Sequence, residues 1–271
     1  MAHGASLTEV LDDAEDVAAR VLAPWGGLLW LAAVPLRLLQ IHLLDRLASF
    51  GTEAASYGTH IQGIATLATG ALLIFLAARV VYVRACVLGF RSGRVPGAEA
   101  ARVGAGPMLT YLYVGLVLEL LALLTAPAMV TLPVFALLGG LGAALSPRAT
   151  RPALLAPWRH LGHESRRLAP LSAFLLLFGV AWVLVTANLY FAFRTGLWLA
   201  GGLPGVDVAY WDVLLSWSNR SFRLLLAAGS TILLEPFWLA ALTMYVLKTQ
   251  FRQNGEDLRL EWERLRAADS R

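Results

Sequence analysis

The chain has 271 residues and a net charge of +4; 58% of its residues are hydrophobic and 15% are charged. A soluble domain usually carries about 25% charged residues, so this composition excludes an ordinary water-soluble fold and indicates a protein of the lipid bilayer. The cations lie at the ends of apolar segments, where membrane topology explains them, so we expect no nucleic-acid partner.

Residues 1–21 predict an amphipathic helix that docks on protein. Ser6 and Glu9 have the spacing of a capping box, and apolar residues recur at helical spacing from Leu7 to Val21. The polar face is acidic, and the residues expected to bind a partner are Asp12, Asp13, Glu15 and Asp16. Anionic lipid head groups repel an acidic face, so we expect it to contact basic loops of this chain or a partner protein. A signal peptide would begin with basic residues instead, so the first apolar segment is expected to stay as a membrane helix.

Residues 22–248 predict a bundle of six transmembrane helices. Their expected ranges are 22–44, 61–83, 107–124, 128–145, 168–193 and 222–247. The apolar run 107–145 is too long for one span of about 20 residues, and Pro127 and Pro133 interrupt it. We divide this run into two helices; the alternative is one span followed by a re-entrant segment. The tail, residues 249–271, is expected to lie in the cytoplasm and to contain a short amphipathic helix.

The distribution of basic residues predicts that both termini are cytoplasmic. Arg20, five arginines in 79–102, five in 148–167 and six cations in 248–271 fall on the same side of the predicted helices, which makes 17 of 22 basic residues. The other side receives only Arg46, Arg194, Arg220 and Arg223. Cytoplasmic loops of membrane proteins carry this excess of cations, and an even number of spans agrees with it. The expected location is a bacterial inner membrane.

Three charged residues are predicted at membrane depth: Arg37, Glu119 and Glu235. An ion in the bilayer centre is costly, so each of them needs a partner or water. One interpretation is a polar centre for a proton relay or for substrate binding. The other is an Arg37–Glu salt bridge that fixes helix packing, with the second glutamate protonated.

Two weaker groups of histidines are candidates for cofactors. His42 and His60 are placed at similar depth near the ends of the first two helices, as axial ligands of a haem would be. His160, His163 and Glu164 have a spacing that puts both imidazoles on one helical face, which suits a metal, although five arginines surround them. A single cysteine, Cys86, excludes sites built from several cysteines. We therefore expect no cofactor.

The last helix and the tail carry a family resemblance. They contain Glu235-Pro236, then Tyr245, then Arg252-Gln-Asn-Gly255-Glu-Asp257-Leu258. This pattern resembles the C-terminal segment of bacterial six-helix membrane proteins of the glycerophosphodiesterase membrane-domain family. The family commonly has an acidic residue just after its tyrosines, whereas this chain has Lys248 at about that position. The resemblance implies a six-helix bundle. It does not imply phosphodiesterase activity, because that chemistry belongs to a separate soluble domain.

The sequence contains no complete catalytic or nucleotide-binding motif, so we expect no enzymatic activity. The first hypothesis is a non-enzymatic membrane subunit or scaffold in a larger assembly, with the bilayer and protein partners as its contacts. The alternative is a transport component, such as the permease half of an ATP-driven exporter.

Overall fold

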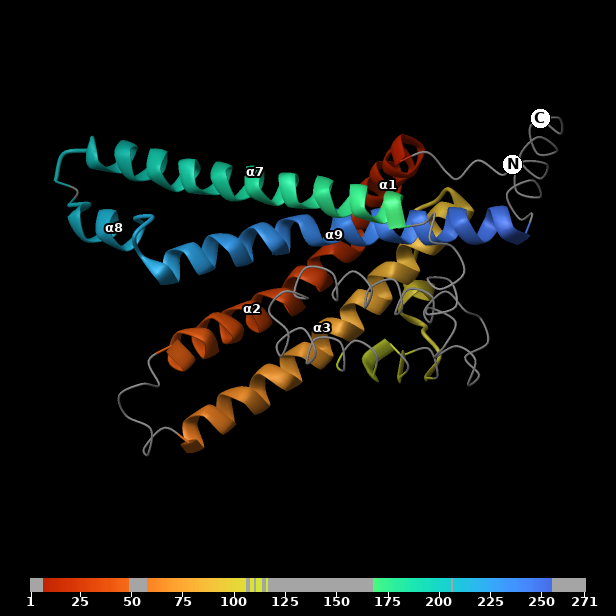
Figure 1. Ribbon diagram of the computed structural model, residues 1–271, viewed down its shortest axis with the longest axis horizontal. Coiled ribbons are helices and arrows are strands. Elements are labelled where there is room, and N and C mark those ends of the chain that lie inside the picture. Colours follow the sequence, from red (N-terminus) through yellow and green to blue (C-terminus); the bar gives the residue numbers. More distant parts are fainter. Residues whose placement is uncertain are drawn as a thin grey trace. The chain divides into compact units, whose positions relative to one another are not determined.

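The computed structural model describes residues 7–48, 58–105, 108–109, 111–113, 116, 168–205 and 207–254 (Figure 1). Over these residues the protein is all-helical and contains no strand, which confirms the all-helical part of the predicted fold class. Four of the described helices are long and apolar enough to cross a membrane: Leu7–His42, Gln62–Ser92, Leu176–Gly201 and Arg220–Tyr245. The other two predicted spans fall in 107–145, most of which lies outside the described residues.

The N-terminal helix and the first membrane helix form one continuous helical segment. Helix α1 covers Leu7–Val21, a π-helical turn η1 covers Leu22–Gly26, and α2 covers Gly27–Ala48. We had expected two separate elements. The wider π turn contains Pro24, which has no backbone N–H to donate, and a π turn accommodates such a break without ending the helix.

The other described helices extend beyond their predicted ends. Helix α3 covers Gly58–Ser92, α7 covers Leu168–Gly201 and α9 covers Arg220–Asn254. The short elements are η2, Ala98–Ala101, and α8, Ala209–Leu214. The predicted loop after residue 83 and the predicted tail after residue 248 both begin as helix. The hydropathy pattern marks where apolar residues end, whereas a helix continues into water until a residue stops it.

A glycine supplies that stop for α3. Gly93 has a φ of 63°, in the left-handed region that favours glycine, and its N–H donates to the carbonyl oxygen of Gly89 at 3.0 Å. This is the usual way in which a helix ends on a glycine. The helix therefore ends at Ser92, nine residues later than the hydropathy pattern predicts.

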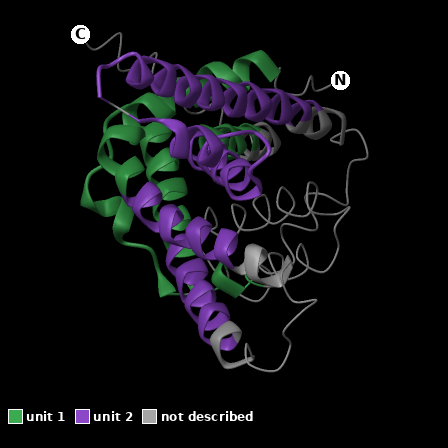
Figure 2. Ribbon diagram, turned by 90° about the vertical axis from the view of Figure 1, so that its left-hand side faces the viewer, with its two compact units in different colours: residues 1–27, 76–165, 236–271 green, residues 28–75, 166–235 purple. Residues whose placement is uncertain are grey.

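The chain divides into two compact units (Figure 2). The first consists of residues 1–27, 76–165 and 236–271, and the second of residues 28–75 and 166–235, so α3 and α9 contribute to both. In the first unit, α1 contacts α3 and α9. In the second, Trp30 Nε1 of α2 donates to the carbonyl oxygen of Ile232 in α9 at 3.1 Å.

Candidate functional site

Helix α1 carries an apolar stripe and an acidic face. The stripe is buried in the first unit and consists of Val10, Ala14, Val17, Ala18 and Val21. At its end, Val21 lies against the buried Gly89 of α3, where a Cβ added to the glycine would come 3.3 Å from Val21 Cγ2. The next turn is fixed by Trp25, whose Nε1 donates to the carbonyl oxygen of Pro96 at 3.1 Å. The helix is thus packed on its own chain.

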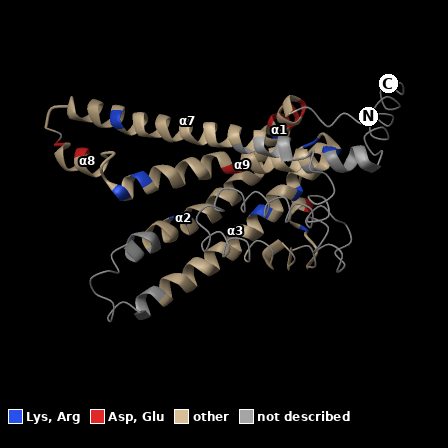
Figure 3. Ribbon diagram, in the orientation of Figure 1, with Lys and Arg blue, Asp and Glu red and all other residues tan. Residues whose placement is uncertain are grey.

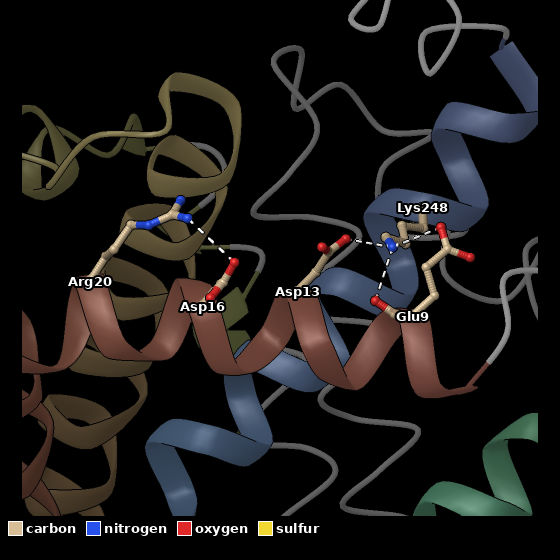
Figure 4. Close-up of polar contacts among 5 residues, drawn as sticks. All are labelled: Glu9, Asp13, Asp16, Arg20 and Lys248. Carbon is tan, nitrogen blue, oxygen red and sulfur yellow. Dashed lines mark hydrogen bonds and ion pairs between the residues drawn. The ribbon is translucent and has the colours of Figure 1, made fainter.

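A single lysine ties the acidic face of α1 to α9 (Figure 4). Lys248 Nζ lies 3.0 Å from Glu9 Oε1, 3.0 Å from the carbonyl oxygen of Glu9 and 2.5 Å from Asp13 Oδ2. An ammonium group has three donors, so these three acceptors satisfy it completely. The Lys248 side chain is only 11% exposed, which shields the ion pairs from solvent. We call Glu9, Asp13 and Lys248 the α1 anchor.

The four acidic residues that were predicted to bind a partner are in different environments: one belongs to the α1 anchor and three lie outside it. Asp13 forms an ion pair within the chain, and its cation comes from α9 rather than from a basic loop. Asp16 pairs with Arg20 one turn later at 3.6 Å, an exposed pair that contributes little. Asp12 and Glu15 are exposed. Figure 4 shows Asp13 and Glu9 pointing towards Lys248.

The loop after α3 is organised by Glu99. Its carboxylate accepts a hydrogen bond from the N–H of Gly97 at 2.9 Å, and its carbonyl oxygen accepts one from Arg84 Nε at 3.2 Å. The pKa of Glu99 is held below its usual value by backbone hydrogen bonds from its own N–H and that of Gly97, and by the nearby charge of Arg102. This loop is also where Pro96 receives Trp25, so its conformation supports the start of the first membrane helix.

Two of the three charges predicted at membrane depth, Arg37 and Glu235, are found in the second unit. Arg37 is half-buried in α2; its Nη1 donates to Gln40 Oε1 at 2.8 Å, and its guanidinium carbon lies 5.7 Å from the centre of the Phe75 ring. Glu235 is buried, 4% exposed, in α9. The following Pro236 lies inside α9, which continues through it. Glu119 lies outside the described residues, so a centre of three charges stays a prediction.

The histidine candidates remain predictions as well. His42 is exposed near the end of α2, and His60 is the third residue of α3. His160, His163 and Glu164 fall outside the described residues, as does the tail beyond Asn254. Among the residues that are described, no group of three or more His, Cys, Asp or Glu side chains could hold a metal ion.

A hydrogen-bonded clasp that the sequence analysis missed joins α7 to α9 in the second unit. Thr186 Oγ1 donates to Ser230 Oγ at 2.8 Å, and both residues are buried. One turn away, Trp182 Nε1 donates to Thr231 Oγ1 at 3.1 Å. Polar side chains of this kind join helices in membranes, where no water competes for the bond. The signal was present in the sequence: Trp182 and Thr186 are four residues apart, so they share one face.

Beyond the clasp, α7 and the start of α9 enclose a groove of about 760 Å³. Residues of α7 between Trp182 and Phe191 line one side, and residues of α9 between Arg220 and Ala227 line the other. We call the end of the groove at the start of α9 its mouth. Trp217 lies there, and its ring meets Tyr190 edge to face with centroids 5.5 Å apart. Figure 3 shows long stretches of α7 and α9 without Lys, Arg, Asp or Glu, and several of the charged residues of these helices lie near α8.

The groove carries two arginines at its mouth, Arg220 and Arg223. A third arginine in this unit, Arg194 of α7, is neutralised by Asp212 of α8 at 2.6 Å. No hydrogen bond or ion pair within the described chain occupies the guanidinium of Arg220 or Arg223. This end of the unit therefore has two available cations beside an apolar groove.

Comparison with known proteins adds no family to these observations. A scan against models of protein families, a search of curated proteins and a search of solved structures each gave no match.

Proposed function

We propose that this protein is a non-enzymatic subunit or scaffold of a larger assembly in a bacterial inner membrane. In this proposal the chain crosses the membrane six times, with both termini in the cytoplasm. The distribution of basic residues supports the orientation, and the four apolar helices support insertion in a bilayer. The resemblance of its C-terminal segment to the glycerophosphodiesterase membrane-domain family agrees with six helices.

The α1 anchor is the observation that carries this proposal. An isolated amphipathic helix loses conformational freedom when it binds a partner, and that loss weakens binding. Here burial of the apolar stripe and the bonds to Lys248 already fix α1 on its own chain. Asp12 and Glu15 stay exposed, and Asp16 makes only an exposed pair with Arg20. The result is a preformed acidic surface that complements a basic protein surface.

A transport component is the second candidate, and one observation favours it. Glu235 is buried in the apolar part of α9, where an ionisable side chain is expensive and frequently belongs to a substrate or proton pathway. A permease would require a separate ATPase partner, because the sequence contains no nucleotide-binding motif. Under this alternative, Glu119→Gln and Glu235→Gln abolish transport. Under the subunit proposal, they change stability or assembly.

The test is purification of the full chain from native membranes in a mild detergent, with mass spectrometry of the proteins that co-elute. A stoichiometric partner supports the subunit proposal. The triple variant Asp12→Asn, Glu15→Gln, Asp16→Asn should then lose this partner while α1 stays anchored. Asp207→Asn is the matched control: it removes one exposed carboxylate elsewhere and keeps a side-chain oxygen for the N–H of Ala209.

Other outcomes separate the hypotheses. If the partner is an ATPase, the exporter alternative replaces the scaffold. If the wild-type protein elutes alone, both proposals fail. If the partner is retained by the triple variant, the assembly stands but its docking surface is not the acidic face of α1.

A further inference from the structure

We propose that the groove between α7 and α9 is a binding site for an anionic glycerophospholipid, with an acyl chain along the groove and the head-group phosphate between Arg220 and Arg223. This site is independent of the acidic face of α1, which lies in the other unit. The proposal rests on the lining of the groove, on the placement of the two arginines and on the aromatic residues at its mouth.

Helical spacing brings the lining together. On α9, Arg220, Arg223 and Leu224, followed by Ala227, recur every three or four residues and so share one face. On α7, the lining residues from Trp182 to Phe191 recur in the same way and extend over about 13 Å at 1.5 Å per residue. Two such faces, one on each helix, line a groove that runs along the helices. An acyl chain in a bilayer runs in the same direction as the helices that cross it.

The floor of the groove offers little to a polar ligand. Its deep polar groups, Trp182 and Thr186, already donate to Thr231 and Ser230. Most other lining residues are apolar, among them Val183, Ala187, Leu224 and Ala227. A groove of about 760 Å³ with this lining falls in the size range of ligand sites and accepts an apolar chain.

The mouth of the groove offers two cations to the phosphate of the ligand. Arg220 and Arg223 are both exposed there and have no partner within the described chain. Guanidinium groups bind phosphate oxygens through two parallel hydrogen bonds. The phosphate is bound by the arginines and not by the first turn of α9, because the N–H groups of Ser221 and Phe222 there already donate to Asn219 Oδ1.

The aromatic residues place the mouth at the depth of lipid head groups. Tyr190 meets Trp217 edge to face, and Phe222 packs between Tyr190 and Phe193. Trp and Tyr concentrate at membrane interfaces, because one part of the ring system is apolar and the other forms hydrogen bonds. A site with an apolar floor, two arginines and an aromatic mouth matches a lipid that has an apolar chain and an anionic head. Its cations also lie on the side of the predicted topology where few basic residues occur, so the positive-inside rule does not account for them.

Native mass spectrometry of the full chain, released from bilayer discs of phosphatidylglycerol or phosphatidylcholine, tests the proposal. We expect the wild type to retain phosphatidylglycerol at least tenfold better than phosphatidylcholine. Arg220→Gln with Arg223→Gln should remove this difference. Arg194→Gln is the matched control, because Arg194 is already neutralised by Asp212, and should change retention less than threefold.

A second pair of variants tests the groove apart from the arginines. Ala187→Phe fills the groove and should release phosphatidylglycerol although both guanidinium groups remain. Ala192→Phe adds the same ring at an exposed position of α7 outside the groove and should have no effect. Circular dichroism shows whether each variant keeps its helices.

Four results would overturn the proposal. The first is equal retention of both lipids by the wild type, and the second is unchanged phosphatidylglycerol on the double arginine variant. The third is unchanged lipid on Ala187→Phe, which would mean that the groove does not hold the acyl chain. Displacement of phosphatidylglycerol by excess inorganic phosphate would likewise assign the arginines to a free anion and reject the lipid.

Discussion

Replacing Lys248 by methionine should detach α1 from α9. Methionine keeps an unbranched apolar side chain but removes both hydrogen bonds to Glu9 and the ion pair with Asp13. Breaking a fully buried ion pair costs about 3–5 kcal/mol, because a charge is left without a partner. Here the Glu9 and Asp13 side chains are 48% and 35% exposed, so water can solvate them once the lysine is gone. We therefore expect a smaller cost, about 1.5–3 kcal/mol, of the order of one hydrogen bond to a charged group.

Hydrogen exchange of the α1 backbone amides measures this effect directly. Local opening of α1 exposes its amides, and every 1.4 kcal/mol lost is about tenfold in the opening equilibrium. The Lys248→Met variant should therefore exchange α1 amides about 10- to 100-fold faster. Asp13→Asn should give a smaller increase, because it keeps an acceptor oxygen and removes one charge.

Two controls limit the interpretation. Asp12→Asn makes the same substitution as Asp13→Asn at the adjacent, exposed residue of α1, and it should leave the exchange of the α1 amides unchanged. Lys248→Arg keeps the charge, but a planar guanidinium does not direct its donors to three convergent acceptors as an ammonium does, so it should restore only part of the protection. If Lys248→Met protects α1 as well as the wild type does, burial of the apolar stripe alone holds the helix and the anchor is incidental.

Three further predictions concern other parts of the structure. A double-mutant cycle of Thr186→Val and Ser230→Ala, measured by thermal unfolding, should give a coupling energy of about 0.6 kcal/mol, the average for hydrogen bonds between membrane helices. A coupling energy of zero would show that this hydrogen bond does not stabilise the packing of α7 on α9. The exposed Arg194–Asp212 pair should contribute about 0.2–1 kcal/mol and weaken with added salt, and a contribution that does not depend on salt would contradict solvent screening. The lowered pKa of Glu99 means that its bond to the loop is fully present above the ordinary carboxyl pKa and is lost as the pH falls through the lowered value. The loop amides of the wild type should exchange more slowly than those of Glu99→Gln at neutral pH, and the two rates should become equal only below the lowered pKa. Equal rates near neutral pH would show that the Glu99 carboxylate does not hold the loop.

The sequence predicted the described membrane helices but not where they end. Runs of apolar residues locate the spans because each must match the thickness of the hydrocarbon layer. The ends depend on local chemistry instead. Gly93 ends α3 through its positive φ, and Asn219 caps the start of α9 with its side chain. Both residue types are known stop and start signals, and reading them beside the hydropathy would have moved the predicted ends closer to those observed.

The candidate site was predicted only in part, because its contacts join distant positions. The acidic face of α1 follows from helical spacing, and its docking on protein follows from charge. That Lys248 supplies the cation does not follow, because the two positions are 239 residues apart and their pairing depends on the tertiary fold. One hint was available: Lys248 is the only lysine in a chain whose other 21 basic residues are arginine. An ammonium group suits a position where three acceptors converge on one point.

The hydroxyl groups in the described membrane helices bear on the choice between scaffold and transporter. Thr66, Thr69 and Thr243 each donate to the carbonyl oxygen four residues earlier in the same helix, and Ser230 and Thr231 do the same at the clasp. Such hydroxyls are satisfied by their own backbone, so their presence in an apolar helix is no sign of a hydrophilic pathway. A permeation route needs polar groups that are free to exchange partners with a substrate. These five hydroxyl groups favour a role in which the helices pack together, and the case for transport then rests on the buried Glu235 and the half-buried Arg37.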